Sequence, residues 1–431
     1  KIVYSLILAG LFFHLSYSSG IERILMEVPS LHGLGLEHGI LTKEKQKEVD
    51  AKSNSIRIGL PKESSNEERR VSISPSGVAV LIANGHEVIV GKGAGEGAHF
   101  SDVEYSEAGG QIAASDSELY STSDLIVKVG PPTDSEVGLM HEKQVLISAL
   151  HLGGTSPTFL KRLIDLGVTG IGFEFIRDSD GTLPIVRMMH EIMGTMSVQT
   201  AARLLESAEG GKGVMMGGIS GVPPSNVVIL GAGVVGEWAA KTALGFGAHV
   251  IVLDNDLGAL RSIEHYLGRG VTTAMATEQY ISQALLTADV VIGAMLTAGQ
   301  KATVIVTEDM VASMRAGSVI VDTVIDQGGC VETSKATTHS KPTFRRHGVI
   351  HYAVPNMPSN AARTATYALT NVLVPYVIKI GDASSVNEAL WTDVGLRNGT
   401  YTYRKHLTKK SLAMMFGMPH RDIELLIASG I

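Results

Sequence analysis

The stretch VVIL-GAGVVG, residues 227–236, decides the fold of this chain. Val227–Leu230 is a short apolar strand, GAGVVG at 231–236 is the loop that follows it, and a helix comes next. A second strand, His249–Leu253, then finishes in Asp254. A GxGxxG loop alone is weak evidence. Between a strand and a helix, with an acidic residue ending the next strand, it is typical of a dinucleotide-binding βαβ unit.

Each glycine of this loop has a definite physical role. Gly231 permits the tight turn, Gly233 lets the backbone approach a pyrophosphate, and Gly236 allows the helix to pack closely on the strand. The first helical residues, Val234 and Val235, bring amide donors and the positive end of the helix dipole to the phosphates. The alternative is a glycine-rich turn without a ligand. The complete strand–loop–helix–strand–acid set disfavours it.

Asp254 indicates which dinucleotide is bound. Its carboxylate would accept hydrogen bonds from the adenosine ribose hydroxyls, and the next residue is Asn255 rather than Arg. Because nothing nearby would pair with a 2′-phosphate, we predict NAD rather than NADP as the cofactor.

Strands separated by helices are expected on both sides of this unit. The predicted strands are Ile56–Leu60, Val88–Val90, Leu125–Val129, Val145–Leu150, Gly170–Phe173, Val290–Ala294 and Val319–Val321, and the clearest helices are Pro75–Ala83, stopped by Gly85, and Met189–Glu206. This alternation predicts parallel βαβ units. The predicted fold class is therefore α/β, with two doubly wound parallel-sheet (Rossmann-like) domains that face a cleft and are joined by long helices.

The predicted domain boundaries follow from the same pattern. Residues 1–55 are an amino-terminal lead, and residues 56–188 are the first segment of a substrate domain. Residues 189–357 form the NAD-binding domain, and residues 358–431 are the second segment of the substrate domain with the tail. Closing the cleft would exclude water around a hydride transfer.

Composition excludes several classes of protein. The chain has 431 residues with a net charge of -7, which argues against nucleic-acid binding. Cys330 is the single cysteine, so an intrachain disulfide and a cysteine-rich zinc site are both excluded, and we predict no metal. A reducing, cytoplasmic location is expected.

The amino end carries a short apolar stretch, Ile2–Phe13, after Lys1. It is too short to span a bilayer and resembles a signal-peptide core without a cleavage site. We favour the interpretation that synthesis begins at Met26 and that residues 1–25 do not belong to the fold. No later stretch suggests stable membrane insertion.

Four polar residues stand out beside predicted strands: Arg70, Lys128, His151 and Asp326. An Arg suits a small carboxylate, a Lys can polarise a second oxygen, and a His can move a proton near neutral pH. The bland alternatives are a solvated charge run for Arg70 and a snorkelling Lys128. For His151 the alternative is a satisfied core histidine. Spacing alone favours these alternatives, and for Asp326 it leaves a site residue and a turn residue about even.

Many further segments, in order, resemble the alanine dehydrogenase family, which is related to the NAD-binding portion of proton-translocating transhydrogenase. The matching segments are Gly59–Glu63, Arg70-Val71 with Pro75, Gly85–Val88, Gly93–Glu96, Gly217–Val222, the 231–236 loop, Val321-Asp322, Ile325–Cys330, Thr337–His339, Asn356–Pro358 and Tyr367–Asn371. The resemblance covers about residues 56–431.

The resemblance implies NAD-dependent oxidative deamination of L-alanine to pyruvate and ammonium, and its reverse. Arg70, Lys128 and Asn356 would bind the substrate, and His151 would be the general acid/base. Asp326 would stand at the junction of nicotinamide and substrate. The resemblance adds cofactor contacts at Arg261, Met295, Met357 and His190, and it implies a homo-oligomer, commonly a hexamer.

Two departures from the family pattern bear on these roles. Many members have two lysines one residue apart, and the second usually contacts the substrate, but here it is Gly130. A Bacteroidetes-like branch shares the Lys-Val-x-Pro-Pro run. Because strand neighbours two apart share a face, Lys128 could take over the role of position 130. The second departure is His190, where the family usually has Ser near the cofactor.

The sequence is also compatible with other functions. The chain could be the NAD-binding subunit of a transhydrogenase or, because of Gly130, a noncatalytic NAD-binding regulator. A related dehydrogenase for lysine-derived substrates would need an acidic pocket. Turnover of L-alanine distinguishes the dehydrogenase from the first two.

Overall fold

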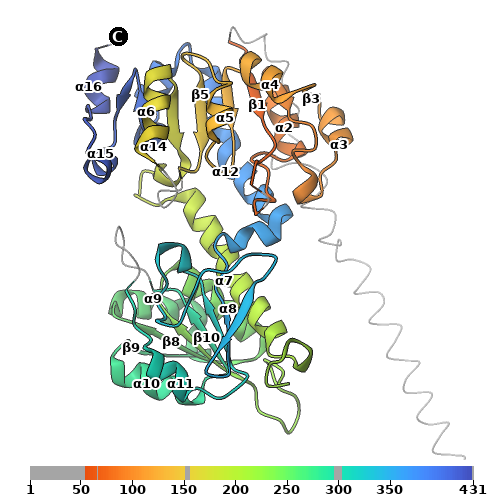
Figure 1. Cartoon of the computed structure of the whole chain (residues 1–431), viewed down its shortest axis with the longest axis vertical. Helices are drawn as coiled ribbons and strands as arrows, with labels where there is room; N and C mark the ends of the chain where they lie inside the picture. The colour runs from red at the N-terminus through yellow and green to blue at the C-terminus, as the bar shows by residue number, and fades with distance from the viewer. Residues whose placement is uncertain (1–53, 66, 151–155, 296–302, 430–431) are drawn as a thin grey trace, which may run out of the picture. The chain divides into compact units, whose positions relative to one another are not determined.

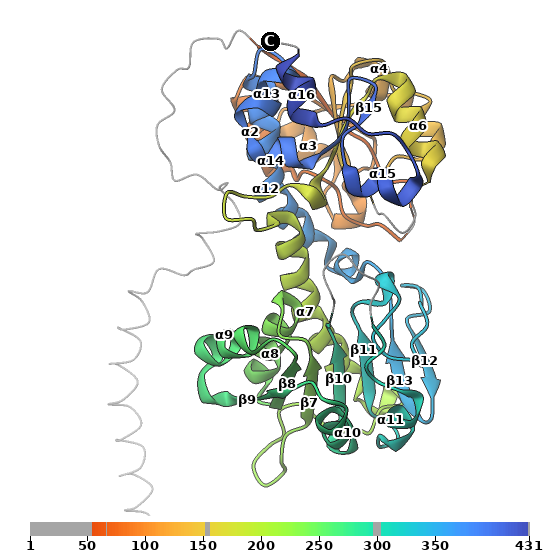
Figure 2. The same cartoon turned by 90° about the vertical axis from the view of Figure 1, so that its left-hand side faces the viewer.

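Two β-sheets, each covered by helices, make up the described part of the chain (Figures 1 and 2). The computed structural model describes residues 54–65, 67–150, 156–295 and 303–429. All of them lie in one compact unit, Ala51–Ile431.

The first sheet has the strand order β15-β14-β6-β5-β4-β1-β2-β3. Its strands are β1 (Arg57–Leu60), β2 (Glu87–Val90), β3 (Gln111–Ile112), β4 (Leu125–Val127), β5 (Val145–Ser148), β6 (Thr169–Gly172), β14 (Thr400–Tyr403) and β15 (His406–Leu407). The strands from β1 to β6 pair in parallel. β14 runs antiparallel to β6, and β15 antiparallel to β14.

The second sheet has the order β12-β13-β11-β10-β7-β8-β9. Its strands are β7 (Asn226–Leu230), β8 (His249–Asp254), β9 (Val271–Met275), β10 (Val290–Gly293), β11 (Val319–Asp322), β12 (Thr343–Arg346) and β13 (Val349–Tyr352). All pairs are parallel except β12 with β13.

In both sheets the order in which successive strands are added reverses near the centre of the sheet. The switch points lie between β1 and β4 in the first sheet and between β7 and β10 in the second. In doubly wound sheets, ligands bind outside the carboxyl ends of the strands at such points. The fold therefore offers two comparable places for a site.

The helices begin and end as follows: α2 (Pro75–Ala83), α3 (Asp102–Glu107), α4 (Asp116–Thr122), α5 (Asp134–Val137), α6 (Pro157–Leu166), α7 (Pro184–Leu204), α8 (Val234–Phe246), α9 (Leu257–Leu267), α10 (Glu278–Thr287), α11 (Glu308–Ser313), α12 (Ala362–Asp382), α13 (Val386–Thr392), α14 (Val394–Gly399), α15 (Lys410–Phe416) and α16 (Ile423–Ala428). Within the part of the chain described, no helix has both the length and the hydropathy needed to cross a membrane.

The predicted α/β class is confirmed, with one correction. The sheets are mixed rather than wholly parallel, because β12 pairs antiparallel with β13 in the second sheet, and β14 and β15 pair antiparallel in the first. β12, β14 and β15 are short and lack the apolar run that marks a strand buried in a parallel sheet. The carboxyl-terminal segment, predicted to belong to the substrate domain, supplies β14 and β15 to the first sheet.

The long helix α7 connects the two sheets through its contacts. It packs on α8 and β11 of the second-sheet region and on α12, which also contacts α2. A Cβ on Gly194 of α7 would lie 2.4 Å from the carbonyl oxygen of Val235, so only a glycine allows α7 and α8 to approach this closely. The start of α8, which follows the glycine loop, is thus held against α7.

Candidate functional site

The glycine loop lies at the switch point of the second sheet, between β7 and α8. Gly231 has φ 115°, and a Cβ there would be 2.5 Å from the carbonyl oxygen of Ala294. A Cβ on Gly236 would be 1.9 Å from the carbonyl oxygen of Gly231. Side chains are excluded at both positions, the first by turn geometry and the second by helix–strand packing.

Gly233 differs from its neighbours because its Cβ direction is open. Apart from Gly233 and its two chain neighbours, no atom of the described residues lies within 4 Å of that position, and Gly233 is the residue immediately before α8. A phosphate could approach the backbone here and meet the free amides of the first helical turn, at Val234 and Val235. The loop therefore fits a dinucleotide pyrophosphate.

Asp254, at the end of β8, is tied to this loop. Its Oδ2 accepts the Ala232 N–H at 2.5 Å, and its Oδ1 accepts the Asp256 N–H at 2.8 Å. Each oxygen keeps a lone pair for another donor. The carboxylate is thus held where a ribose hydroxyl at the loop could reach it.

The remaining predicted cofactor residues occupy varied environments. Arg261 is exposed on α9, and Met295 is half-buried just beyond β10. Met357 is buried in the core of the second-sheet region. His190 is half-buried on α7, and burial lowers its pKa.

Two carboxylates follow β11 at the same edge of the sheet. Asp322 is buried and accepts N–H groups of Cys330 and Val324, while Asp326 is exposed in the short helix Ile325–Gln327. Surrounding protein atoms keep part of the water from Asp326, which raises its pKa, and the charge of Asp322 adds to the rise. Asp326 therefore takes up a proton more readily than an ordinary aspartate.

Arg70 is held in a polar cluster after β1. Its Nε donates to Glu68 Oε1 at 2.7 Å, and its Nη2 donates to Glu68 Oε2 at 2.6 Å and to Asn356 Oδ1 at 2.7 Å. Asn356 Nδ2 donates back to Glu68 Oε2 at 2.9 Å. The solvated charge run is therefore wrong for Arg70, whose side chain is 6% exposed.

The cluster fixes the charge state of Glu68. Burial alone would raise the pKa of Glu68, but the charge and hydrogen bonds of Arg70 outweigh it and lower the pKa. Arg70 Nη1 lies 3.2 Å from the sulfur of Met189 on α7. Among the contacts described, Nη1 therefore has no acidic partner.

Lys128 follows β4 directly and is completely buried. Its Nζ lies 2.5 Å from Glu136 Oε1 on α5 and 3.9 Å from Glu63 Oε2. A snorkelling side chain is therefore wrong here. Contact between Lys128 and a substrate would require Nζ to leave Glu136.

His151 lies outside the described residues, so the structure gives no geometry for the predicted general acid/base. Its strand, β5, is present and ends at Ser148. The strand lies beside β4 in the first sheet, which puts its carboxyl end at the same edge as Lys128.

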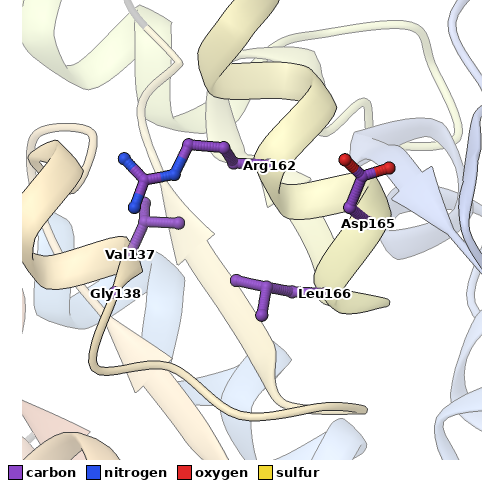
Figure 3. A pocket seen from close by; sticks show the side chains of 5 residues that line it. All are labelled: Val137, Gly138, Arg162, Asp165 and Leu166. Carbon is purple, nitrogen blue, oxygen red and sulfur yellow. The ribbon is translucent and has the colours of Figure 1, made fainter.

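A hollow on the surface is separate from these residues. It measures about 280 Å³ and is lined by Val137, Gly138, Arg162, Asp165 and Leu166 (Figure 3). Arg162 pairs with Asp134 at 2.6 Å. None of the predicted site residues lines it. No group of His, Cys, Asp or Glu within the described ranges could hold a metal ion.

Sequence reasoning missed the three acidic partners Glu63, Glu68 and Glu136. Glu63 ends the segment Gly59–Glu63, Glu68 lies two residues before Arg70, and Glu136 is the N3 residue of a capping box begun by Thr133. Lys128 is the signal that could have indicated Glu63 and Glu136, because a buried lysine requires an acidic partner.

Two family models match the chain. The alanine dehydrogenase/PNT N-terminal domain matches residues 59–193, and the alanine dehydrogenase/PNT C-terminal domain matches residues 197–410.

Similar proteins and structures agree with these models. An alanine dehydrogenase of Methanococcus maripaludis is 44% identical over 85% of this chain and 98% of its own length. One of Halomonas elongata is 41% identical over 86% of this chain and its full length. A solved L-alanine dehydrogenase has 41% identity and a TM-score of 0.80, covering 84% of this chain and 99% of that one. A transhydrogenase structure from Sinorhizobium meliloti has 25% identity and a TM-score of 0.71, covering 82% and 99%.

Proposed function

Because this chain belongs to the alanine dehydrogenase/PNT family, we propose that it catalyses the NAD-dependent oxidative deamination of L-alanine to pyruvate and ammonium. The observation that carries the proposal is the 44% identity to an alanine dehydrogenase over 98% of that protein. The glycine loop supports it, since the open position at Gly233 and the excluded positions at Gly231 and Gly236 match what a bound dinucleotide requires.

We propose that the cofactor is held by the loop 231–236, the first turn of α8 and Asp254. When bound, NAD would accept the hydride that leaves the substrate Cα. Asp254 would accept hydrogen bonds from ribose hydroxyls and would repel a 2′-phosphate, which favours NAD over NADP. Arg261, Met295, Met357 and His190 complete the predicted set of cofactor contacts.

Arg70 is proposed to bind the carboxylate of alanine. Glu68 occupies the Nε–Nη2 edge of its guanidinium, so Nη1 is the donor available to a substrate carboxylate. Asn356 holds the other side of the cluster, in a left-handed backbone conformation with φ 57° that Asn tolerates well. The guanidinium is therefore oriented before the substrate arrives.

Proton transfer is assigned to residues near the strand ends. We propose that His151 takes a proton from the water that attacks the imine, or from the carbinolamine, as pyruvate and ammonium form. Asp326 would stand beside the reacting carbon, and Lys128 would support the substrate oxygens. A direct role for Lys128 requires it to exchange Glu136 for substrate.

The test is NADH formation from L-alanine at alkaline pH, with protein that starts at Met26. Alanine-dependent reduction that is abolished in His151→Ala, with NADH binding retained, supports the dehydrogenase. Tight NADH binding without turnover contradicts it and supports the transhydrogenase subunit or the noncatalytic regulator.

A homo-oligomer, with six subunits as in the family, and a cytoplasmic location are proposed along with this function. Sedimentation of the purified protein tests the first. A monomer at micromolar concentration would contradict it.

A further inference from the structure

The switch point of the first sheet contains a buried carboxylate that the proposed reaction does not use. Glu63 lies three residues after the end of β1, and its side chain is 7% exposed. Its Oε1 accepts the Val129 N–H at 2.7 Å, and its Oε2 accepts the Gly130 N–H at 3.2 Å. Glu63 thus bridges the segment after β1 to the turn after β4.

Glu63 also faces an unbalanced set of charges. Lys128 lies between Glu63 and Glu136, and the Tyr120 hydroxyl of α4 donates to Glu136 at 3.0 Å. Glu68 adds a repelling charge from the arginine cluster. Two carboxylates share one ammonium, and the shorter contact belongs to Glu136.

These surroundings raise the pKa of Glu63 to about 7. Burial is the main cause, and the charge of Lys128 and the two amides oppose it only in part. Glu136 has the opposite shift. Burial would raise its pKa, but Lys128 and Thr133 outweigh burial and lower it. The two acids therefore have different protonation behaviour although they share one lysine.

Gly130 lies directly against Glu63. Among the described residues, the atom that a Cβ at Gly130 would meet is Glu63 Oε2, at 3.4 Å. The end of β4, directly before this turn, is linked to the Arg70 segment, because the hydroxyl of Ser72, two residues after Arg70, donates to the Val127 carbonyl at 2.8 Å. A change at Glu63 can therefore reach both Gly130 and the Arg70 segment.

We propose that Glu63 is a positioning residue whose charged form holds the turn after β4 and Lys128 in the arrangement required for substrate turnover. The inference rests on the proposed function, and it assigns this control to a group that does not touch the substrate. When Glu63 is protonated, the oxygen that carries the proton becomes a hydroxyl and accepts an N–H more weakly than a carboxylate oxygen does. The ion pair with Lys128 is lost as well, so two of the three contacts between Glu63 and the turn are weakened or lost.

The first test compares Glu63→Gln with wild type by kcat/KM for L-alanine across pH. The amide has the same shape but cannot ionise. At about pH 9 we expect kcat/KM of wild type to be about tenfold higher than that of the variant, which corresponds to the loss of about one charge-assisted hydrogen bond. At about pH 5.5 the two values should be about equal. A group that ionises in the same way in both proteins cancels in this ratio. A ratio that stays constant with pH would overturn the proposal.

The control is Glu96→Gln. Glu96 pairs with the neighbouring Lys62 at 3.0 Å, but its side chain is 69% exposed. The substitution makes the same chemical change at a carboxylate that contacts the residue before Glu63. Its kcat/KM should match that of wild type at every pH.

The second test does not depend on activity. A carboxyl with a raised folded-state pKa stabilises the fold below its unfolded pKa, and this stability is lost as pH rises towards about 7. Since Gln does not titrate, the melting temperature of Glu63→Gln relative to wild type should rise by several degrees between about pH 5 and about pH 8. A constant difference would show an ordinary Glu63 and overturn the proposal. If alanine is not turned over at all, the positioning role falls with the proposed function, whereas this experiment still decides whether Glu63 changes charge in the folded protein.

Discussion

The two sheets have the same strand order around their switch points, yet they use those points in opposite ways. Between β7 and β10 the chain offers backbone, with a glycine loop and an open helix end. Between β1 and β4 it offers buried side chains, with Glu63, Lys128 and Glu136 joined in one network. In the proposed function, one topology would serve a phosphate-bearing cofactor at one switch point and a small charged substrate at the other. The difference lies in whether main-chain amides or ionised groups line the strand ends.

The largest expected effect follows from removing the charge at the centre of the first switch point. Lys128→Met would leave two carboxylates buried without their cation, and we expect a loss of about 3–5 kcal/mol in the free energy of unfolding. Denaturant unfolding measures it. Lys161→Met is the matched control, since its pair with Asp165 is exposed and about 0–1 kcal/mol is expected. Equal losses of unfolding free energy in the two variants would show that the buried network contributes no more to stability than an exposed ion pair.

The next effect tests the second switch point through two glycines of one loop. Gly236→Ala places a Cβ 1.9 Å from the carbonyl oxygen of Gly231, so we expect a loss of about 1–3 kcal/mol or more. In Gly233→Ala the Cβ meets no atom of the described residues beyond its chain neighbours, so the variant should fold normally while it binds NADH more weakly. Thermal melts and NADH titrations separate the two results. Normal NADH affinity in Gly233→Ala would place the pyrophosphate elsewhere.

A smaller effect concerns the choice of cofactor. Asp254→Asn keeps an oxygen for the Ala232 N–H but removes the charge that repels a 2′-phosphate. We expect the ratio of kcat/KM for NADP to that for NAD to rise about tenfold, or about 1.4 kcal/mol. An unchanged ratio would mean that Asp254 only braces the loop.

The smallest effect is expected at His190. It lies one helical turn before Gly194, on the face of α7 that approaches the start of α8. Since burial lowers its pKa, the imidazole is neutral near pH 7 and above, and one neutral hydrogen bond contributes about 1 kcal/mol. His190→Ser should raise KM for NAD about fivefold at any pH from about 7 upward. An unchanged KM would remove His190 from the cofactor site.

How well the sequence predicts each region follows from how local its interactions are. The glycine loop, Asp254 and helix α2 were predicted at or near their observed bounds, because turn geometry, capping and strand alternation act over a few neighbouring residues. The antiparallel strands β12, β14 and β15 were not predicted, because pairing with a neighbouring strand, rather than a local pattern, decides them. Glu63, Glu68 and Glu136 were missed for the same reason. Asn356 meets Arg70 across 286 positions, and its side-chain contact follows from the fold rather than from any local pattern.

The most direct test of the account is an NADH titration of Arg70→Lys, combined with its kcat/KM for L-alanine. A lysine keeps the charge but cannot maintain the two-point contact with Glu68 or orient a carboxylate in the same way. We predict NADH affinity within about twofold of wild type and alanine turnover lower by about a hundredfold, equivalent to about 2.7 kcal/mol. Loss of NADH binding in parallel with turnover, or turnover that remains at the wild-type rate, would contradict the assignment of cofactor and substrate to different switch points.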